Sequence, residues 1–270
     1  MKRLGIIGAG NMGEALVRGL IASGVTTPDM ICIFDVDSAK CRVLADELGI
    51  AVAPDVRDTV GPDTEMLVLA VKPQVIVDVL DSIADRVRES LVIISIAAGI
   101  STDFILSRLK GPARVIRAMP NAGAMVGASA TALCKGGSAD EADVEASMGL
   151  FRSVGSAVAV DEKMMNVVTA LSGSGPGYVF TIMEALTDGA VLMGLDRSTA
   201  RALTVQTLLG AAKIAASGNT SFSDLKDRIT SPGGTTIAGL QVLESGGLRG
   251  LLMDAIEAAT RRAEELQARK

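Results

Sequence analysis

The feature that most constrains the fold is a glycine-rich segment that starts at the eighth residue of the chain. Residues 8–13 read Gly-Ala-Gly-Asn-Met-Gly, which has the spacing G-x-G-x-x-G. The segment follows the apolar run Leu4–Ile7 directly and opens a stretch of helical periodicity. In that setting the glycines allow a tight turn, a close approach of the backbone to a pyrophosphate, and packing of the helix on the strand. The segment predicts a dinucleotide-binding loop, and the alternative is a glycine turn between strand and helix that binds nothing.

The rest of the first 160 residues fits the same architecture. Short β-branched apolar runs alternate with stretches of helical periodicity, a pattern typical of stacked βαβ units and a mostly parallel sheet. The predicted strands are Leu4–Ile7, Met30–Phe34, Met66–Ala70, Leu91–Ser95, Arg114–Arg117, Ser129–Leu133 and Ala157–Val160. The predicted helices are Met12–Ala22, Ala39–Leu48, Gln74–Arg86, Ser101–Leu109 and Glu141–Arg152, with Gly24 and Gly49 as C-terminal caps. Residues 1–160 are therefore expected to form a doubly wound α/β domain of the Rossmann type.

Residues 161–270 are expected to form a second, all-helical domain, because the strand signal ends at Asp161. Breaks between helices are predicted at 173–177, 194–198, 218–221 and 231–234. The stretches 200–216 and 248–266 carry small and aliphatic residues on more than one face. That is more apolar surface than a lone five-helix domain needs to bury, so a partner subunit is expected there.

Composition excludes several classes of function. The chain has no histidine, and its three cysteines lack metal-ligand spacing, so no metal site is expected. A net charge of -5, with one tyrosine and five phenylalanines, argues against a nucleic-acid surface. Apolar runs are too short for a membrane span and no signal peptide is evident, which favours the cytoplasm. The expected partner is a small molecule.

The carboxyl edge of the predicted sheet supplies the other candidate cofactor contacts. Asp35 stands about twenty residues past the glycine loop, where a ribose 2′-hydroxyl acceptor belongs. Taken alone it favours NADH, but Lys40 and Arg42 follow closely, and either Asp35 or Asp37 could instead cap the next helix. The choice between NADPH and NADH stays open. The residues expected to contact the cofactor are Ile7, Gly8, Ala9, Gly10, Asn11, Met12, Gly13, Asp35, Ala70, Val71, Lys72, Pro73, Ala97 and Ala98.

Two later segments are rich in glycine and hydroxyl groups, namely Leu171–Tyr178 and Thr230–Thr236. In the second, Pro232 suits a first helical turn, and the N–H groups from Gly233 to Thr236 are expected to point unpaired at a small carboxylate. The alternative for each segment is a turn or cap between helices.

Taken together, these motifs resemble the pyrroline-5-carboxylate reductase family. The resemblance covers essentially the whole chain and rests on the glycine loop, Ala70–Pro73, Arg117–Asn121, Leu171–Tyr178 and the run from Leu225 to Gly247. It implies NAD(P)H-dependent reduction of 1-pyrroline-5-carboxylate to L-proline, the last step of proline biosynthesis. It also implies a C-terminal domain that forms a homodimer or a ring of dimers.

The resemblance implies particular substrate contacts as well. The substrate carboxylate is expected on the helix start that contains Ser231, Gly234, Thr235 and Thr236, and Glu162 is expected to line the substrate pocket. Thr236 matches the residue proposed to donate a proton to the ring nitrogen, a role that water could also fill. A cyclic imine is basic enough to need no strong protein acid, which agrees with the absence of histidine.

The sequence also departs from the family's usual pattern. Ala122 and Gly123 replace a Thr-Pro pair, Gly177 replaces an alanine, and Val56 replaces a frequent asparagine. Asp35 stands where many relatives carry a small polar residue. These departures concern cofactor choice and loop geometry more than reaction type.

Two other functions remain as alternatives. A related imine or β-hydroxyacid reductase would share the architecture, but the hydroxyacid enzymes usually need an acid-base residue such as lysine in the helical domain, and no lysine lies between Lys163 and Lys213. A non-catalytic dinucleotide-binding protein would show a broken substrate loop, whereas Ser231–Thr236 is intact.

Overall fold

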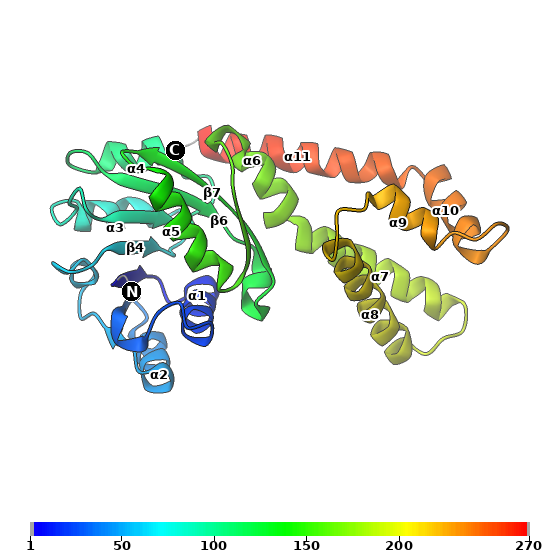
Figure 1. The fold of residues 1–270 in the computed structure, drawn as a ribbon, viewed down its shortest axis with the longest axis horizontal. Helices are drawn as coiled ribbons and strands as arrows, with labels where there is room; N and C mark the ends of the chain where they lie inside the picture. Colours follow the sequence, from blue (N-terminus) through cyan, green and yellow to red (C-terminus); the bar gives the residue numbers. More distant parts are fainter. Residues whose placement is uncertain (1–2, 269–270) are drawn as a thin grey trace. The chain divides into compact units, whose positions relative to one another are not determined.

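The computed structural model describes residues 3–268, which fall into two compact units (Figure 1). The sheet unit contains the described residues up to Ser174 together with those from Ala258 onward. The helical unit contains Gly175–Glu257. These units are defined by packing, and the division into a cofactor domain of residues 1–160 and a second domain of residues 161–270 stays a prediction.

The sheet unit is built on an eight-stranded sheet with the order β3-β2-β1-β4-β5-β6-β7-β8. All neighbouring strands run parallel except β6 and β7, which are antiparallel. The glycine loop follows β1, where the strand order reverses between β2 and β4, and ligands of open α/β sheets bind at such a switch point. The strands are β1 (Leu4–Ile7), β2 (Ile31–Phe34), β3 (Ala51–Val52), β4 (Met66–Leu69), β5 (Val92–Ser95), β6 (Arg114–Met119), β7 (Ser129–Gly137) and β8 (Gly155–Ala159).

Helices cover both faces of this sheet (Figure 1). They are α1 (Asn11–Ala22), α2 (Ser38–Leu48), α3 (Ile76–Ile83), α4 (Thr102–Arg108) and α5 (Glu141–Arg152). Neighbouring residues of a strand serve opposite faces, so Ile6 packs in the core under α1, α2 and α5, whereas Ile7 packs in the core under α3 and α4. Because both faces of the sheet are buried, its central strands are mostly apolar. Helices on both faces of a mostly parallel sheet confirm the predicted doubly wound fold.

Short helical segments complete the sheet unit. They are the 3-10 turns η1 (Pro28–Met30), η2 (Val56–Thr59), η3 (Ala122–Val126) and η4 (Glu162–Met164), then α6 (Met165–Val168) and the π-helical turn η5 (Thr169–Gly173). The end of α11 returns to this unit, where the backbone at Gln267 lies against Gly99.

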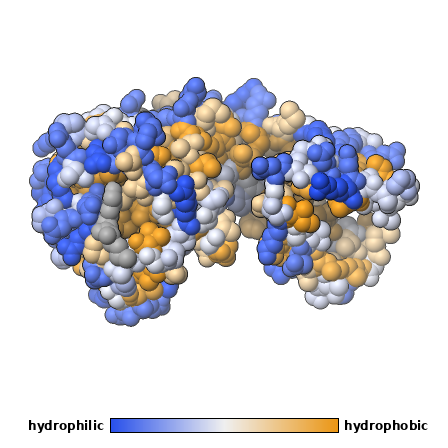
Figure 2. Space-filling view, viewed as in Figure 1, coloured by the Kyte–Doolittle hydropathy of each residue, from blue (hydrophilic) through white to orange (hydrophobic). Residues whose placement is uncertain are grey.

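The helical unit consists of α7 (Gly175–Leu192), α8 (Arg197–Ala216), α9 (Phe222–Arg228), α10 (Thr235–Ser245) and most of α11 (Leu248–Ala268). Helices α7 and α8 pack together through a buried hydrogen bond between the Thr187 and Thr204 hydroxyls. Ala200 is the one buried apolar residue among the described residues of this unit, and apolar side chains remain on the surface (Figure 2). Leu192 and Met193, for example, are 85% and 84% exposed. This single chain therefore leaves the apolar faces of α7–α11 uncovered.

The structure corrects several sequence-based bounds. Strand β3 was not predicted, because two residues are too few to show alternation. Strand β7 continues four residues beyond Leu133, as far as Gly137, because residues 132–137 pair with β6. Helix α3 is shorter than predicted at both ends. The predicted break at 173–177 is a π-helical turn followed by a bend at Ser174. Within residues 3–268, no helix has the length and apolar composition needed to cross a membrane.

Candidate functional site

The three motif glycines meet different surroundings. Gly8 has φ +112°, and an added Cβ would lie 2.3 Å from the Ala70 carbonyl oxygen. At Gly13 an added Cβ would lie 2.0 Å from the Gly8 carbonyl oxygen. At Gly10 it would meet no atom within 4 Å. The fold therefore requires glycine at positions 8 and 13, whereas position 10 opens into free space that a ligand can approach.

Helix α1 presents uncapped N–H groups to that space. Its N-cap is Gly10, which has an extended conformation and supplies no side-chain hydrogen bond. The acidic side chain of the first turn, Glu14, is held by Arg18 at 2.8 Å. Free N–H groups and the helix dipole both favour an anion at such a helix start.

A cleft of ≈540 Å³ adjoins the glycine loop. The predicted cofactor residues among those that line it are Ile7, Gly8, Gly10, Asp35, Ala70, Val71 and Lys72. Eight lining residues were not among the predicted contacts: Phe34, Val36, Lys40, Val56, Val75, Asp78, Val79 and Ser82. Four of them, at positions 75, 78, 79 and 82, have the i, i+3, i+4, i+7 spacing of one helix face. That spacing is the signal in the sequence that could have identified these residues as one surface.

The other predicted cofactor residues do not line this cleft. They are Ala9, Asn11, Met12, Gly13, Pro73, Ala97 and Ala98. Ala97 is buried in the core under α3 and α4, while Ala98 is exposed on the loop after β5. A role for these residues in cofactor binding stays a prediction.

The structure separates the roles of the two carboxylates after β2. Asp37 is the N-cap of α2, where it accepts a hydrogen bond from the Ala39 N–H at 3.2 Å. Asp35 instead accepts the Ala9 N–H at 2.7 Å and the Asp37 N–H at 2.8 Å. Asp35 is therefore tied to the glycine loop and lines the cleft, and Asp37 makes the cap.

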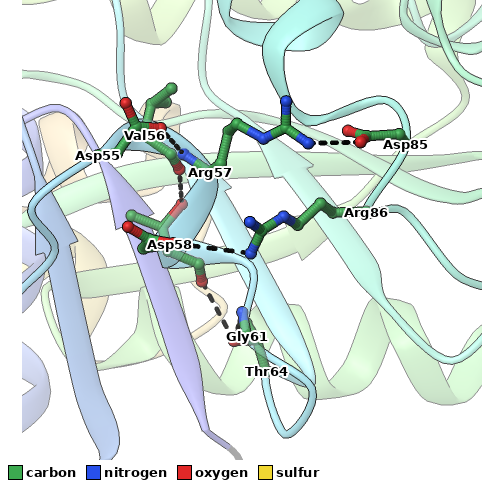
Figure 3. Close-up of polar contacts among 9 residues, drawn as sticks. Asp55, Val56, Arg57, Asp58, Gly61, Thr64, Asp85 and Arg86 are labelled. Atoms are coloured by element: carbon green, nitrogen blue, oxygen red, sulfur yellow. Dashed lines mark hydrogen bonds and ion pairs between the residues drawn. The ribbon is translucent and has the colours of Figure 1, made fainter.

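Charged side chains join η2, which lines the cleft at Val56, to the segment after α3 (Figure 3). Arg57 of η2 pairs with Asp85, and Asp58 of η2 lies 3.7 Å from Arg86. Asp85 and Arg86 lie just past the end of α3. The network thus ties η2, which places Val56 on the cleft, to the helix that, with its N-cap Val75, supplies four more lining residues.

Glu162, predicted to line the substrate pocket, has its oxygens engaged within the sheet unit. They accept the Thr102 N–H at 2.8 Å and the Thr102 hydroxyl at 2.5 Å, and one lies 3.3 Å from the Arg117 guanidinium. The Arg117 side chain is only 4% exposed. Burial and, secondarily, the Glu162 charge raise the pKa of the nearby Cys134 thiol to about 12. Glu162 also borders a second cavity, of ≈480 Å³.

The segment around the π-helical turn is anchored to the loop after β6. The Asn121 side-chain amide donates to the Ser172 carbonyl oxygen at 3.0 Å, and an added Cβ on Gly173 would lie 2.7 Å from Met119 Cε. The Oδ1 atom of the same Asn121 side chain in turn accepts from the Gly123 N–H at 3.0 Å. Two of the sequence motifs therefore meet through Asn121.

The second predicted anion site lies at the start of α10. The prediction that Pro232 opens the helix is wrong: the helix begins at Thr235, with Gly234 as its N-cap. The Gly234 N–H is bonded to the Ser231 carbonyl oxygen at 3.0 Å and is not free, because residues 231–234 form a turn. Gly234 supplies no capping side chain, so the free N–H groups begin at Thr235. Among residues 3–268, no group of three or more His, Cys, Asp or Glu side chains could hold a metal ion.

Comparison with known proteins gives consistent matches over nearly the whole chain. Residues 162–266 match the family described as pyrroline-5-carboxylate reductase dimerisation, and residues 3–99 match NADP oxidoreductase, coenzyme F420-dependent. A pyrroline-5-carboxylate reductase from Methanosarcina acetivorans is 42% identical over 265 residues, which is 98% of each chain.

Solved structures agree with these matches. The structure of a pyrroline-5-carboxylate reductase from Coxiella burnetii superposes with a TM-score of 0.94 at 39% identity, covering 98% of both chains. A pyrroline carboxylate reductase from Plasmodium falciparum, with NADP bound, has a TM-score of 0.85 at 27% identity and also covers 98% of both chains.

Proposed function

The chain belongs to the pyrroline-5-carboxylate reductase family, and from that premise we propose that it reduces 1-pyrroline-5-carboxylate to L-proline with NADPH or NADH, the last step of proline biosynthesis. The observation that carries the proposal is the match over 98% of both chains, which includes the glycine loop and the start of α10 together. An enzyme that shared only the cofactor domain would not match across the second segment.

The residues of the sheet unit fit a dinucleotide. Gly8 and Gly10 let the backbone approach the pyrophosphate, and the uncapped start of α1 supplies N–H donors. The cleft lined by Asp35, Val71 and Lys72 takes the adenosine end. We assign Ala9, Asn11, Met12, Gly13, Pro73, Ala97 and Ala98 to the same cofactor site. When bound, the reduced nicotinamide supplies the hydride that the imine carbon accepts.

The start of α10 is the proposed anchor for the substrate carboxylate. The N–H groups of Thr235 and Thr236 have no capping side chain, and the turn from Ser231 to Gly234 fixes where they point. We propose that the Thr236 hydroxyl donates a proton to the ring nitrogen, with water as the alternative donor. Holding the carboxylate and the ring in one orientation contributes to the rate by reducing the entropy lost in the reaction step.

Glu162 is proposed to border the substrate pocket. Its contacts with Thr102 and Arg117 support a fixed carboxylate rather than one that turns toward each substrate. The Glu162 carboxylate would thus set the charge and shape of the pocket edge, because Thr102 and Arg117 keep its two oxygens in place.

The proposed assembly is a homodimer or a ring of dimers, built from a cofactor domain of residues 1–160 and a dimerisation domain of residues 161–270. The match of residues 162–266 to a dimerisation family supports this, as do the uncovered apolar faces of α7–α11. We further propose that the enzyme acts in the cytoplasm without a metal, a nucleic acid or a membrane. The free thiols of Cys32, Cys41 and Cys134 fit a reducing compartment.

A steady-state assay with the cyclic imine and each reduced cofactor tests the function. We expect consumption of the reduced cofactor that depends on 1-pyrroline-5-carboxylate, with L-proline as product. Turnover of a β-hydroxyacid or of another imine in preference to this substrate would instead support a related reductase. Cofactor binding without turnover of any of these substrates would support a non-catalytic dinucleotide-binding protein.

A further inference from the structure

We propose that the adenosine end of the cleft selects NADH over NADPH, with Asp35 as the residue that determines this specificity. The inference rests on the proposed function, because it assigns the cleft beside the glycine loop to the cofactor. It goes further by choosing between the two nicotinamide cofactors, which differ only in a phosphate on the adenosine ribose.

The position of Asp35 is fixed by the backbone. Its Oδ2 atom accepts the Ala9 N–H at 2.7 Å, and its Oδ1 atom accepts the Asp37 N–H at 2.8 Å. Each carboxylate oxygen can accept a second hydrogen bond, so both can still receive a ribose hydroxyl. Because these two bonds hold the carboxylate on the cleft, it cannot turn away from a 2′-phosphate without leaving the Ala9 and Asp37 N–H groups unpaired.

The cations near Asp35 do not offset this charge. Lys40 lines the cleft, but its Nζ atom lies 3.5 Å from the Asp37 carboxylate. Lys72 follows β4, two strands away from β2, a separation of roughly 9.6 Å across the sheet. The cleft holds a second carboxylate, Asp78 on α3. Arg42, on α2, does not line the cleft. A 2′-phosphate in the cleft would therefore face Asp35, while the lining cation on α2, Lys40, is already paired with Asp37.

The residue after Asp35 gives no help to a phosphate either. Val36 lines the cleft, is 94% exposed, and has no polar group in its side chain. Together with Val56, Val75 and Val79 it forms an apolar lining suited to the adenine ring. Ion pairs join η2, which carries Val56, to the segment after α3, which carries Val79 (Figure 3). An adenine ring on this apolar lining would bring the ribose toward Asp35, which lines the same cleft.

The test compares kcat/KM for NADH and NADPH in the parent enzyme and in three variants. The parent is expected to prefer NADH about tenfold or more, since a single repulsion between close charges at a protein surface has at least that effect. Asp35→Asn keeps the shape of the side chain, removes its charge and gives up one of its two backbone hydrogen bonds, and it should reduce the preference about tenfold. Val36→Arg supplies a cation at the same place and should raise kcat/KM for NADPH by a similar factor. Val43→Arg is the matched control, because Val43 is exposed on α2 and does not line the cleft, and it should leave the ratio unchanged.

Dissociation constants of NADH and NADPH, measured by fluorescence without the imine, separate this inference from the proposed function. If neither the parent nor any variant turns over the imine, the proposed function fails. The inference still stands in that case if the parent binds NADH more tightly than NADPH and both Asp35→Asn and Val36→Arg reduce that difference. A parent enzyme that prefers NADPH overturns the inference, whatever its activity. So does an unchanged NADH-to-NADPH ratio in both Asp35→Asn and Val36→Arg.

Discussion

Replacing Gly10 with alanine should separate cofactor binding from folding. Gly10 has φ -73° and ψ 179°, a conformation that alanine adopts without strain, and the new methyl group would meet no protein atom within 4 Å. The matched variants are Gly8→Ala and Gly13→Ala in the same loop. There the methyl group would lie 2.3 Å and 2.0 Å, respectively, from a backbone oxygen.

The expected magnitudes follow from these distances. Alanine at a compatible glycine position stabilises the folded chain by ~0.4 to 1 kcal/mol, because it restricts the unfolded chain. At Gly8 the positive φ alone costs on the order of 1 to 3 kcal/mol, and displacing the end of β4 adds to that cost. The Gly10 methyl group should also displace the pyrophosphate and lose at least one charge-assisted hydrogen bond, which contributes ~1.5 to 3 kcal/mol. That loss corresponds to about a tenfold to hundredfold weaker cofactor.

Two measurements on the same preparations check the reasoning. Urea unfolding should show Gly10→Ala at least as stable as the parent, and Gly8→Ala and Gly13→Ala clearly less stable. Fluorescence titration with NADH and with NADPH should show weak binding by Gly10→Ala despite its intact fold. If Gly10→Ala bound both cofactors as tightly as the parent, the open space at residue 10 would not be the pyrophosphate site.

Three further variants test other parts of the site. Thr236→Ala should lower kcat about a hundredfold if the hydroxyl donates the proton, with NADH affinity unchanged, and an unaltered kcat would leave water as the donor. Glu162→Ala should lower the free energy of unfolding in urea by ~3 kcal/mol, because it leaves the buried Arg117 unpaired, and a parental value would refute the importance of that ion pair. Burial raises the pKa of Cys134 to about 12, so the folded chain holds this proton more tightly than the unfolded chain. This contribution to the free energy of unfolding is complete below the unfolded pKa of about 8.5 and is lost as pH rises toward 12, by at most ~1.4 kcal/mol per pH unit. The free energy of unfolding of Cys134→Ala should therefore depend less on pH than that of the parent between roughly pH 9 and 10.5, as unfolding curves at several pH values would show.

The parts of the fold that the sequence predicted well are those where burial dictates residue type. Strand β1 and helix α5 have the predicted bounds, and the other long elements differ by a few residues at their ends. Central strands of a doubly wound sheet are apolar on both faces, so they stand out from their flanking loops. The two-residue strand β3 is paired only with β2 at the edge of the sheet and leaves no such signal.

The candidate site was harder to predict, because it depends on hydrogen bonds between residues distant in sequence. The sequence left open whether Asp35 or Asp37 caps α2; the bond from the Ala39 N–H to Asp37 identifies the cap, and the bond from the Ala9 N–H ties Asp35 to the glycine loop. It likewise gave no sign that Glu162 is held by Thr102, sixty residues earlier. Residue types and spacing identify which groups are present, whereas their roles depend on which partners the fold brings within hydrogen-bond distance.

The helices differ in whether a side chain caps their first turn. Helices α2, α4, α5, α8 and α9 begin at an aspartate or serine whose side chain accepts a backbone N–H of the first turn. Helices α1 and α10 begin at Gly10 and Gly234 and forgo that bond, which typically contributes ~1 kcal/mol. At Gly234 an added Cβ would lie 2.4 Å from the Ser231 Oγ atom, so the turn itself excludes a capping side chain. At Gly10 the fold leaves room for a cap that the sequence does not use. Packing therefore does not constrain position 10, which is why Gly10→Ala tests the proposed cofactor site without testing the fold.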